Sequence, residues 1–348
     1  MCNKCERLTI KLIQKLRYVI GKIQVLRYKL NTINLMQFFE EGNCRIPLSR
    51  VNHFSRGIRV NNKFPAGKRI EFSTDADILN IKVLYRTRRI LRHMSSTGTS
   101  GIDIYVRKNE SFSWKRCLAP ENDLQMYIQD SIFLGPGEKV IRIFYPPFAS
   151  IDSVLIRKSD FNLLMGENRK RIVVYGSSIS QGCAASRPSL SYTNLLSILT
   201  DCDVLNFGFS ESAKGEKKVI EYISSCNAEI IILEYDQNAS LEELRKTHKN
   251  VYDTIRENSD SWIIFMTRLS GEFSIPIGED TERVSIINET YNYAKKKKDQ
   301  KIVLINSENI FEEEKSFYFT DGIHPNDLGM KVISQKLFNV ILERGMLE

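Results

Sequence analysis

The sequence predicts an α/β domain built on a five-stranded parallel sheet, preceded by an antiparallel β-sandwich or jelly roll and by a basic N-terminal helix. Three patterns predict this fold class. Apolar residues recur in steps of four and three near the N-terminus, short β-rich runs fill residues 40–160, and strand-like and helical stretches alternate after Arg171. We therefore expect parts at residues 1–38, 40–165 and 168–348, with a boundary in the polar stretch 166–170.

Residues 7–35 are expected to form one long amphipathic helix. Residues 1–30 carry eight basic side chains and one acidic side chain, a net charge of +7. A broad apolar face beside basic side chains suits a helix lying on an anionic membrane surface, and packing on the protein's own body or on a partner is an equal alternative. A parallel homodimer would gain no ion pairs, because Lys15 and Lys22 would face Ile13 and Ile20. The apolar seam consists of Leu12, Leu16, Val19, Ile23, Leu26, Leu30 and Ile33.

Composition and charge exclude several classes of protein. The 348 residues are 42% hydrophobic and 26% charged, as in a globular protein, and no apolar run is long enough to span a membrane. The net charge is +8, of which +7 lies in residues 1–30, so the rest of the chain is nearly neutral and no nucleic-acid partner is expected.

Cysteine usage and the N-terminus predict where the protein resides. The chain has seven cysteines, an odd number, and they are widely spaced. This pattern does not favour a set of disulfide bonds and is typical of reduced thiols in the cytoplasm. Cys2 and Cys5 have no second cysteine or histidine pair to complete a zinc site, so no metal is expected. The N-terminus does not resemble a secretory signal. We expect a cytoplasmic protein, with peripheral contact to the inner membrane face as a hypothesis.

The β-rich region predicts the sandwich. Its runs are short and separated by turn-prone stretches, and none has helical periodicity, which is typical of antiparallel sheets. The expected strands are Gly57–Val60, Arg69–Ser73, Ile78–Tyr85, Gly101–Val106, Lys139–Tyr145 and Asp152–Arg157.

The region after Arg171 predicts the parallel sheet. Five buried-strand runs are each followed by a helical stretch, which indicates helices on both faces of the sheet. The expected strands are Ile172–Tyr175, Val204–Phe207, Glu229–Glu234, Trp262–Met266 and Lys301–Ile305. The expected helices are Ser191–Thr200, Gly215–Ser225, Leu241–Asn258, Thr281–Lys297 and Asn326–Arg344.

Four small polar blocks lie where such a sheet binds ligands, outside the carboxyl ends of its strands. They are Gly176–Gly182, Gly208–Ser212, Tyr235–Ala239 and Asp321–Asp327. Each block alone could be an ordinary turn or helix cap. Their joint occurrence, in order, at one predicted edge of the sheet favours a functional site.

The blocks contain the groups that acyl transfer needs. Ser178, on a tight turn between strand and helix, could act as a nucleophile if a base removes its proton. His324 could be that base, because imidazole titrates near neutral pH, and Asp321 could orient it. The backbone N–H groups of Ser178 and Gly208 and the amide of Asn238 could form an oxyanion hole.

These motifs resemble those of the SGNH (GDSL-like) hydrolases, a flavodoxin-like family of esterases, lipases and acyltransferases. The stretches Y-G-S-S-I-S-Q-G-C-A-A-S-R-P-S, E-Y-D-Q-N-A and D-G-I-H-P-N-D-L-G are similar to the blocks of a carbohydrate-esterase-like branch. G-I-D-I-Y, at residues 101–105, resembles the G-x-D-L-Y signature of the β-sandwich that precedes such domains. The resemblance covers about residues 45–345 and leaves only the basic helix outside.

The resemblance implies a role for each matched residue. Ser178 would be the nucleophile, His324 the base and Asp321 its orienting group, with Gly208 and Asn238 as oxyanion donors. Two departures stand out. Ser177 replaces the commonest aspartate of the first block, and residues 236–237 replace the usual glycine of the third. Neither change removes a group that the mechanism needs.

The expected function is hydrolysis of O-acyl esters, O-acetyl esters first, on a carbohydrate or glycoconjugate, with no cofactor. An O-acyltransferase with the same triad and a catalytically inert glycan-binding module are the alternatives. Arg187 could bind an anionic or sugar substrate, and a structural ion pair is at least as good an interpretation of this residue.

Overall fold

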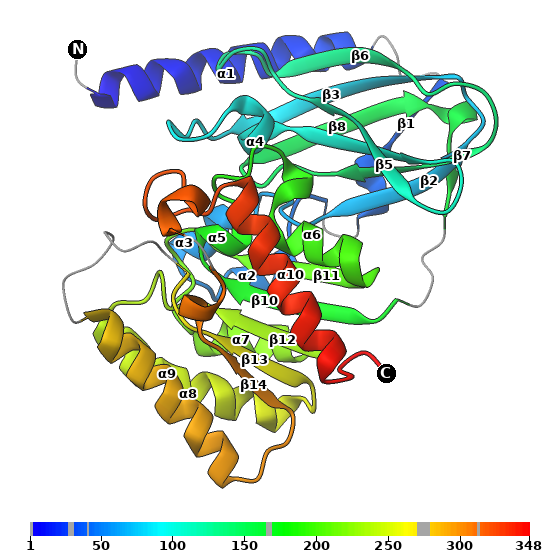
Figure 1. Ribbon diagram of the computed structural model, residues 1–348. Coiled ribbons are helices and arrows are strands. Elements are labelled where there is room, and N and C mark those ends of the chain that lie inside the picture. Colours follow the sequence, from blue (N-terminus) through cyan, green and yellow to red (C-terminus); the bar gives the residue numbers. More distant parts are fainter. Residues whose placement is uncertain (1–2, 27–30, 40–41, 165–168, 270–278, 312–313) are drawn as a thin grey trace. The chain divides into compact units, whose positions relative to one another are not determined.

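The chain divides into two compact units, each with its own hydrophobic core (Figure 1). The computed structural model describes residues 3–26, 31–39, 42–164, 169–269, 279–311 and 314–348. The first unit comprises Met1–Cys44, Lys63–Glu167 and Arg187–Ser189. The second comprises Arg45–Asn62, Asn168–Ser186 and Leu190–Glu348. Residues 45–62 thus fold with the second unit, although the sandwich lies between them and the rest of that unit in the sequence.

The second unit is built on the predicted parallel sheet of five strands, in the order β11-β10-β12-β13-β14. This is the order 2-1-3-4-5 of flavodoxin-like folds, in which the chain reverses direction across the sheet beside the first strand. The prediction of this fold class is confirmed. The strands are β10 (Arg171–Gly176), β11 (Asp203–Gly208), β12 (Ile230–Glu234), β13 (Trp262–Met266) and β14 (Ile302–Ile305).

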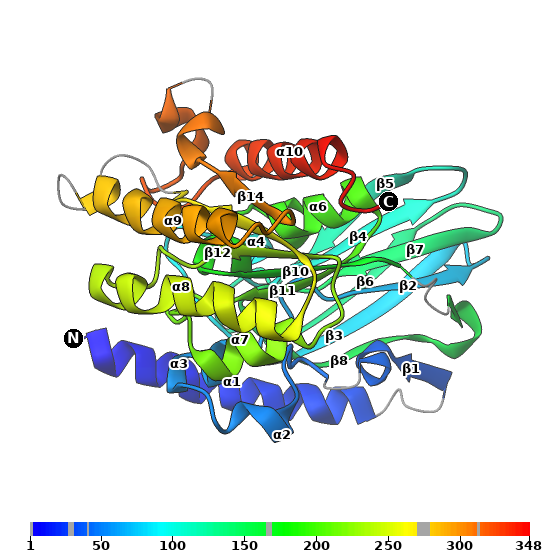
Figure 2. The same cartoon turned by 90° about the horizontal axis from the view of Figure 1, so that it is seen from below.

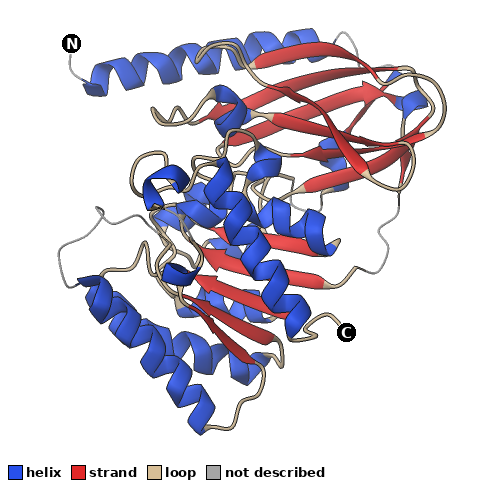
Figure 3. Ribbon diagram, viewed as in Figure 1, coloured by secondary structure: helices blue, strands red, loops and turns tan. Residues whose placement is uncertain are grey.

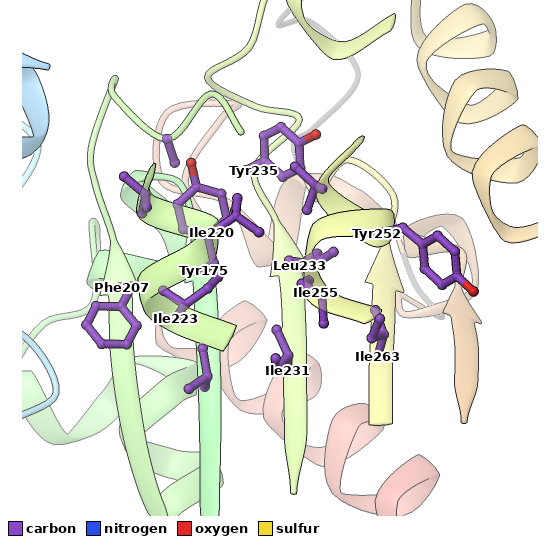
Figure 4. Close-up of a cluster of buried hydrophobic side chains, with 14 of the residues drawn as sticks. Tyr175, Phe207, Ile220, Ile223, Ile231, Leu233, Tyr235, Tyr252, Ile255 and Ile263 are labelled. Atoms are coloured by element: carbon purple, nitrogen blue, oxygen red, sulfur yellow. The ribbon is translucent and has the colours of Figure 1, made fainter. Parts of the chain in front are cut away.

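Helices cover both faces of this sheet (Figure 2). One face packs against α7 (Lys217–Ser224), α8 (Leu241–Asn258) and α9 (Glu279–Lys296), and Figure 4 shows part of that core. The other face packs against α6 (Tyr192–Thr200) and α10 (Asp327–Glu343). The strands are buried on both sides, which explains their nearly continuous apolar sequences.

Residues 45–62 complete the first of these two cores. They form α2 (Leu48–Val51) and α3 (Arg56–Asn61), and they add Ile46 and Ile58, both fully buried, to the core that contains the buried side chains of α7. The prediction of a strand at 57–60 was therefore wrong. Ser55 caps a helix here by accepting a hydrogen bond from Ile58 N, and Ile58 is the one apolar side chain of the helix that becomes buried.

The first unit is the predicted antiparallel β-sandwich (Figure 3). One sheet has the order β1-β8-β3-β6 and the other the order β5-β4-β7-β2-β9, with one core between them. The helix α4 (Ser96–Ser100) interrupts the strands. The strands are β1 (Thr32–Asn34), β2 (Arg69–Thr74), β3 (Ile78–Arg88), β4 (Ile102–Arg107), β5 (Phe112–Leu118), β6 (Tyr127–Phe133), β7 (Lys139–Phe144), β8 (Ala149–Arg157) and β9 (Asn162–Leu163).

The N-terminal helix α1 spans Asn3–Leu26 and is shorter than the predicted 7–35. Residues 32–34 pair instead with β8 as an antiparallel strand, and Asn34 caps the short 3₁₀ turn that follows. Residues 27–30 lie outside the described part of the chain. None of the described helices is long and apolar enough to cross a bilayer.

Candidate active site

The turn that carries Ser178 joins β10 to the short helix α5 (Ser178–Gln181). Ser177 caps α5 by accepting a hydrogen bond from Ile179 N, which places Ser178 at the first helical position. Gly176 allows the chain to turn this tightly, because a Cβ there would lie 2.1 Å from Ser180 Oγ. Gly182, with a φ of 108°, ends the helix in the left-handed region.

A buried carboxylate fixes this turn by accepting hydrogen bonds from it. Glu234, at the end of the neighbouring strand β12, is 1% exposed. Its carboxylate accepts hydrogen bonds from the N–H of Ser177 at 3.1 Å and from the hydroxyls of Ser177 and Ser180. Burial raises the pKa of Glu234 to about 7, although the bonds from Ser180 and Ser177 act to lower it. This role of Glu234 could not be predicted from the sequence, because it depends on the pairing of β12 with β10.

The loop before α10 is organised by Asp321. One carboxylate oxygen accepts hydrogen bonds from the N–H groups of Ile323 at 3.1 Å and His324 at 2.8 Å. Gly322 takes the left-handed conformation that this turn requires, with a φ of 78°. Asn326 then caps α10 by accepting from Leu328 N and Gly329 N. The loop is thereby fixed on both sides of the histidine.

Ser178, His324 and Asp321 form one chain of hydrogen bonds. Ser178 Oγ lies 2.9 Å from His324 Nε2, and His324 Nδ1 lies 2.8 Å from the second carboxylate oxygen of Asp321. Although burial raises it, the pKa of Asp321 is lowered overall by the hydrogen bonds from His324. An ionised carboxylate only accepts hydrogen bonds, so Nδ1 carries the ring proton and Nε2 can accept the serine proton. The structure therefore brings together the three residues expected to act in catalysis.

A second nucleophilic side chain, that of Cys183, has a raised pKa. Cys183 lies five residues after Ser178 and is buried. Burial, and secondarily the charge of Asp321, raise the pKa of its thiol to about 12. The thiolate is the reactive form of cysteine, so the raised pKa disfavours Cys183 as a nucleophile at neutral pH.

Two of the three expected oxyanion donors, Ser178 and Asn238, have an N–H group that could donate to a bound oxyanion. Within the described chain, no acceptor takes the backbone N–H of Ser178. Asn238 uses its side-chain Nδ2 to donate to Phe209 O at 2.9 Å, which orients the amide and leaves its other N–H. By contrast, the N–H of Gly208 donates to Asn206 Oδ1 at 2.8 Å.

Gly208 has a steric role instead. A Cβ at this position would lie 2.2 Å from Gln181 N and 2.6 Å from Ser180 C, both backbone atoms of the nucleophile helix. Only glycine lets the end of β11 approach α5 so closely. Arg45, which the sequence analysis did not single out, holds this place by donating from Nη1 to Gly208 O at 2.6 Å.

Glu211, in the loop after β11, has an unusual backbone conformation. It has a φ of 59°, which is unusual for a residue other than glycine. Its backbone N–H has no acceptor in the described part of the chain. Nothing in the residue type pointed to this conformation.

Arg187 takes the structural alternative that the sequence left open. Its Nη1 donates to Asp103 Oδ2 at 2.8 Å, and its guanidinium lies 4.8 Å from the ring centre of Trp114. Trp114 Nε1 and Ser189 Oγ bind the same carboxylate, which is buried. Asp103 is the aspartate of G-I-D-I-Y, so this motif anchors residues 187–189 within the first unit.

Comparisons with known proteins show which families the two parts of the chain match. Residues 169–342, half of the chain, match the model of the GDSL-like lipase/acylhydrolase family. Residues 23–159 match the GxDLY model, described as the N-terminus of Esterase_SGNH_hydro-type. No curated protein matches the chain.

Several solved structures share the fold. A protein from Bacteroides ovatus ATCC 8483 described as a GDSL-like lipase is 23% identical with a TM-score of 0.80, covering 91% of this chain and 96% of that one. A salicylyl-acyltransferase from a tetracycline biosynthetic pathway is 15% identical with a TM-score of 0.73, covering 87% and 90%. A family two carbohydrate esterase from Clostridium thermocellum, solved with cellohexaose, is 14% identical with a TM-score of 0.55, covering 80% and 92%.

Proposed function

The chain belongs to the GDSL-like lipase/acylhydrolase family, and from this premise we propose that it is a serine esterase acting on O-acyl esters, O-acetyl esters first, of a carbohydrate or glycoconjugate. The observation that carries the proposal is the chain of hydrogen bonds from Ser178 through His324 to Asp321. Each member has the partner that nucleophilic catalysis requires.

The reaction would proceed in two halves. Ser178 Oγ attacks the ester carbonyl while His324 Nε2 takes its proton, and Asp321 stabilises the imidazolium that forms. The N–H groups of Ser178 and Asn238 would bind the oxyanion of the tetrahedral intermediate. As this intermediate collapses, the alcohol leaves with the proton from His324. Water then attacks the acyl-serine by the same route, releasing the carboxylic acid and restoring Ser178.

Two features support a carbohydrate as the alcohol. The chain carries the GxDLY-type sandwich ahead of its hydrolase unit, and its fold is shared with a carbohydrate esterase that was solved with a hexasaccharide. An acetyl group suits a nucleophile on a polar, tightly hydrogen-bonded turn better than a long acyl chain, which needs an apolar channel.

Acyl transfer is the second candidate, since the fold is also shared with a salicylyl-acyltransferase. Both reactions form the same acyl-enzyme and differ in whether water or a second alcohol attacks it. Mass spectrometry of the products with and without added acceptor sugars distinguishes them, because only a transferase yields a product that depends on the acceptor.

The test of the proposal is the intact mass of the protein after treatment with a fluorophosphonate probe. We expect one adduct on the wild type and none on Ser178→Ala, with kcat for a small acetyl ester reduced on the order of 10⁶-fold in the variant. Ser285→Ala, which removes an exposed serine hydroxyl from α9, is the control and should keep both the adduct and the activity. A wild type that is unlabelled and inactive on acetyl esters would overturn the proposal and favour an inert glycan-binding protein.

A further inference from the structure

The N-terminal helix α1 has a stripe of large apolar side chains that its own unit does not cover. Each of the six is between 48% and 70% exposed. An exposed apolar stripe of this length on a surface helix is the signature of a face that docks on something apolar. We call it the α1 stripe, and it consists of Leu8, Leu12, Leu16, Val19, Ile20 and Ile23.

The helix contacts its own unit through a different face. Gln14 and Gly21 are buried, Gln14 Nε2 donates to Asp123 O at 2.9 Å, and Tyr18 donates to Asp152 Oδ1. Gly21 lies so close to β3 that a Cβ there would be 2.5 Å from Leu84 Cδ1. On a helical wheel with about 100° per residue, the α1 stripe spans an arc of about 120°. Gln14, Tyr18 and Gly21 lie on the opposite side of this wheel. Packing on the protein's own body therefore leaves the stripe unused.

Basic side chains border the α1 stripe. On the same helical wheel, Lys11, Lys15 and Lys22 lie along one edge of the stripe and Arg17 lies along the other. Residues 7–26 contain no acidic residue. The α1 stripe thus has positive charge along both edges. This arrangement is complementary to a partner with an apolar interior and a negatively charged outer layer.

A basic hollow lies on the face of the sheet that supports α1. Leu84 and Tyr127 pack beneath the helix, and Lys82 and Gln129, each two residues away along a strand, lie on that same face. Lys82 and Gln129 line a hollow of about 930 Å³. Its other basic lining residues are Arg157 and Lys158, and none of its lining residues within the described part of the chain is acidic.

We propose that α1 binds a membrane surface rich in anionic lipid. The α1 stripe enters the boundary between headgroups and acyl chains, the lysines contact anionic headgroups, and the basic hollow faces the same surface. A second copy of the chain is a poorer occupant, because pairing two stripes would bring rows of lysines together without an acidic partner. This proposal does not depend on the proposed esterase activity.

The test is co-sedimentation of the full chain with vesicles of phosphatidylcholine alone or mixed with phosphatidylglycerol. We expect binding to the anionic vesicles that weakens with added salt. The triple variant Lys11→Gln/Lys15→Gln/Lys22→Gln should bind them on the order of 100-fold more weakly. Leu12→Asn/Leu16→Asn should abolish binding. Lys295→Gln/Lys296→Gln/Lys298→Gln, which removes the same charge from the exposed end of α9 and the turn after it, should bind like the wild type.

Hydrolysis of a small soluble ester should be unchanged in all these variants, because the substituted side chains are exposed and take no part in the proposed reaction. Equal binding to neutral and anionic vesicles, or binding that none of the α1 variants alters, would overturn the proposal. So would a dimer seen by light scattering without lipid that Leu12→Asn/Leu16→Asn dissociates, because the occupant of the stripe would then be a second chain.

Discussion

Asp321 divides its two carboxylate oxygens between structure and chemistry. One oxygen fixes the backbone of the loop and the other accepts the proton of His324 Nδ1. Ile323 and His324 provide the backbone donors, so the carboxylate that orients the imidazole also shapes the loop that carries it. An asparagine here could keep the backbone turn, but its neutral side chain would no longer stabilise the imidazolium.

Asn238 is expected to contribute to catalysis through its side-chain amide. Asn238→Ala removes one expected oxyanion donor, so kcat should fall by roughly 10²–10³-fold, while KM changes little because the lost bond forms mainly in the transition state. Steady-state kinetics on a small acetyl ester measures this. Asn250→Ala, an exposed asparagine on α8 that donates to Lys246 O, serves as the matched control. An equal loss in both variants would exclude a specific role for Asn238.

The residues of the site differ in how far the sequence alone predicts their roles. Ser178, His324 and Asp321 could be named because their chemistry is rare and each lies beside a predicted strand or helix end. The role of Glu234 could not be foreseen, since it arises when β12 pairs beside β10. Gly208 was expected to donate its N–H, but Asn206, two residues earlier, accepts it through a bond that only the folded turn creates.

At the scale of elements, the cap of α10 links helix stability to the site. Asn326→Ala should lower the free energy of unfolding by about 1 kcal/mol, the usual cost of a lost N-cap. Asn326→Ala should also lower kcat. His324 lies two residues before Asn326, and without the cap the loop that carries it would no longer hold it close to Ser178. Ser95→Ala removes the cap of α4 and should cost similar stability with full activity retained. Urea unfolding and kinetics on both variants test this, and unchanged kcat in Asn326→Ala would contradict it.

Elements were predictable where burial alone determined them. The strands of the parallel sheet are apolar throughout because helices cover both faces, and each was expected within a residue or two of its position. The strands β5 and β6 were missed because few of their side chains are buried, so the alternation that marks a strand is broken by polar residues. The pattern at residues 57–60 alternates like a strand, yet the cap at Ser55 and the packing of Ile58 favour a helix.

For the whole molecule, buried carboxyl groups predict how stability depends on pH. Burial raises the pKa of Glu234 and of Asp236 to about 7, and for Asp236 the charge of Glu234 adds to the effect. The ordinary values are 4.5 and 3.8. Between these values and pH 7, the folded chain holds more protons than the unfolded chain, so the free energy of unfolding should fall as pH rises through this window.

The expected fall between pH 5 and pH 8 is about 2–4 kcal/mol. Urea unfolding at several pH values measures it, and Glu234→Gln, which cannot ionise at that position, should show a clearly smaller fall. Burial lowers the pKa of His248 from 6.5 to about 3, so this group acts in the opposite direction below pH 6.5 and offsets part of the fall. The lowered pKa of Asp321 also opposes it, but only below its ordinary value of 3.8, outside this window. Stability that is flat or rises from pH 5 to pH 8 would contradict the prediction.

The placement of residues 45–62 has a consequence for how the chain is made and divided. This segment supplies Ile46 and Ile58 to the core of the second unit and Arg45 to the turn beside its nucleophile helix. It leaves the ribosome about 110 residues before Arg171. At roughly 5–20 residues per second, it waits several seconds while the sandwich is synthesised and can fold. A gene fusion that contains only residues 169–342, the part matched by the family model, would lack residues 45–62. We therefore expect the hydrolase unit of this chain to be inherited together with its sandwich during evolution, and not to recombine as a separate domain.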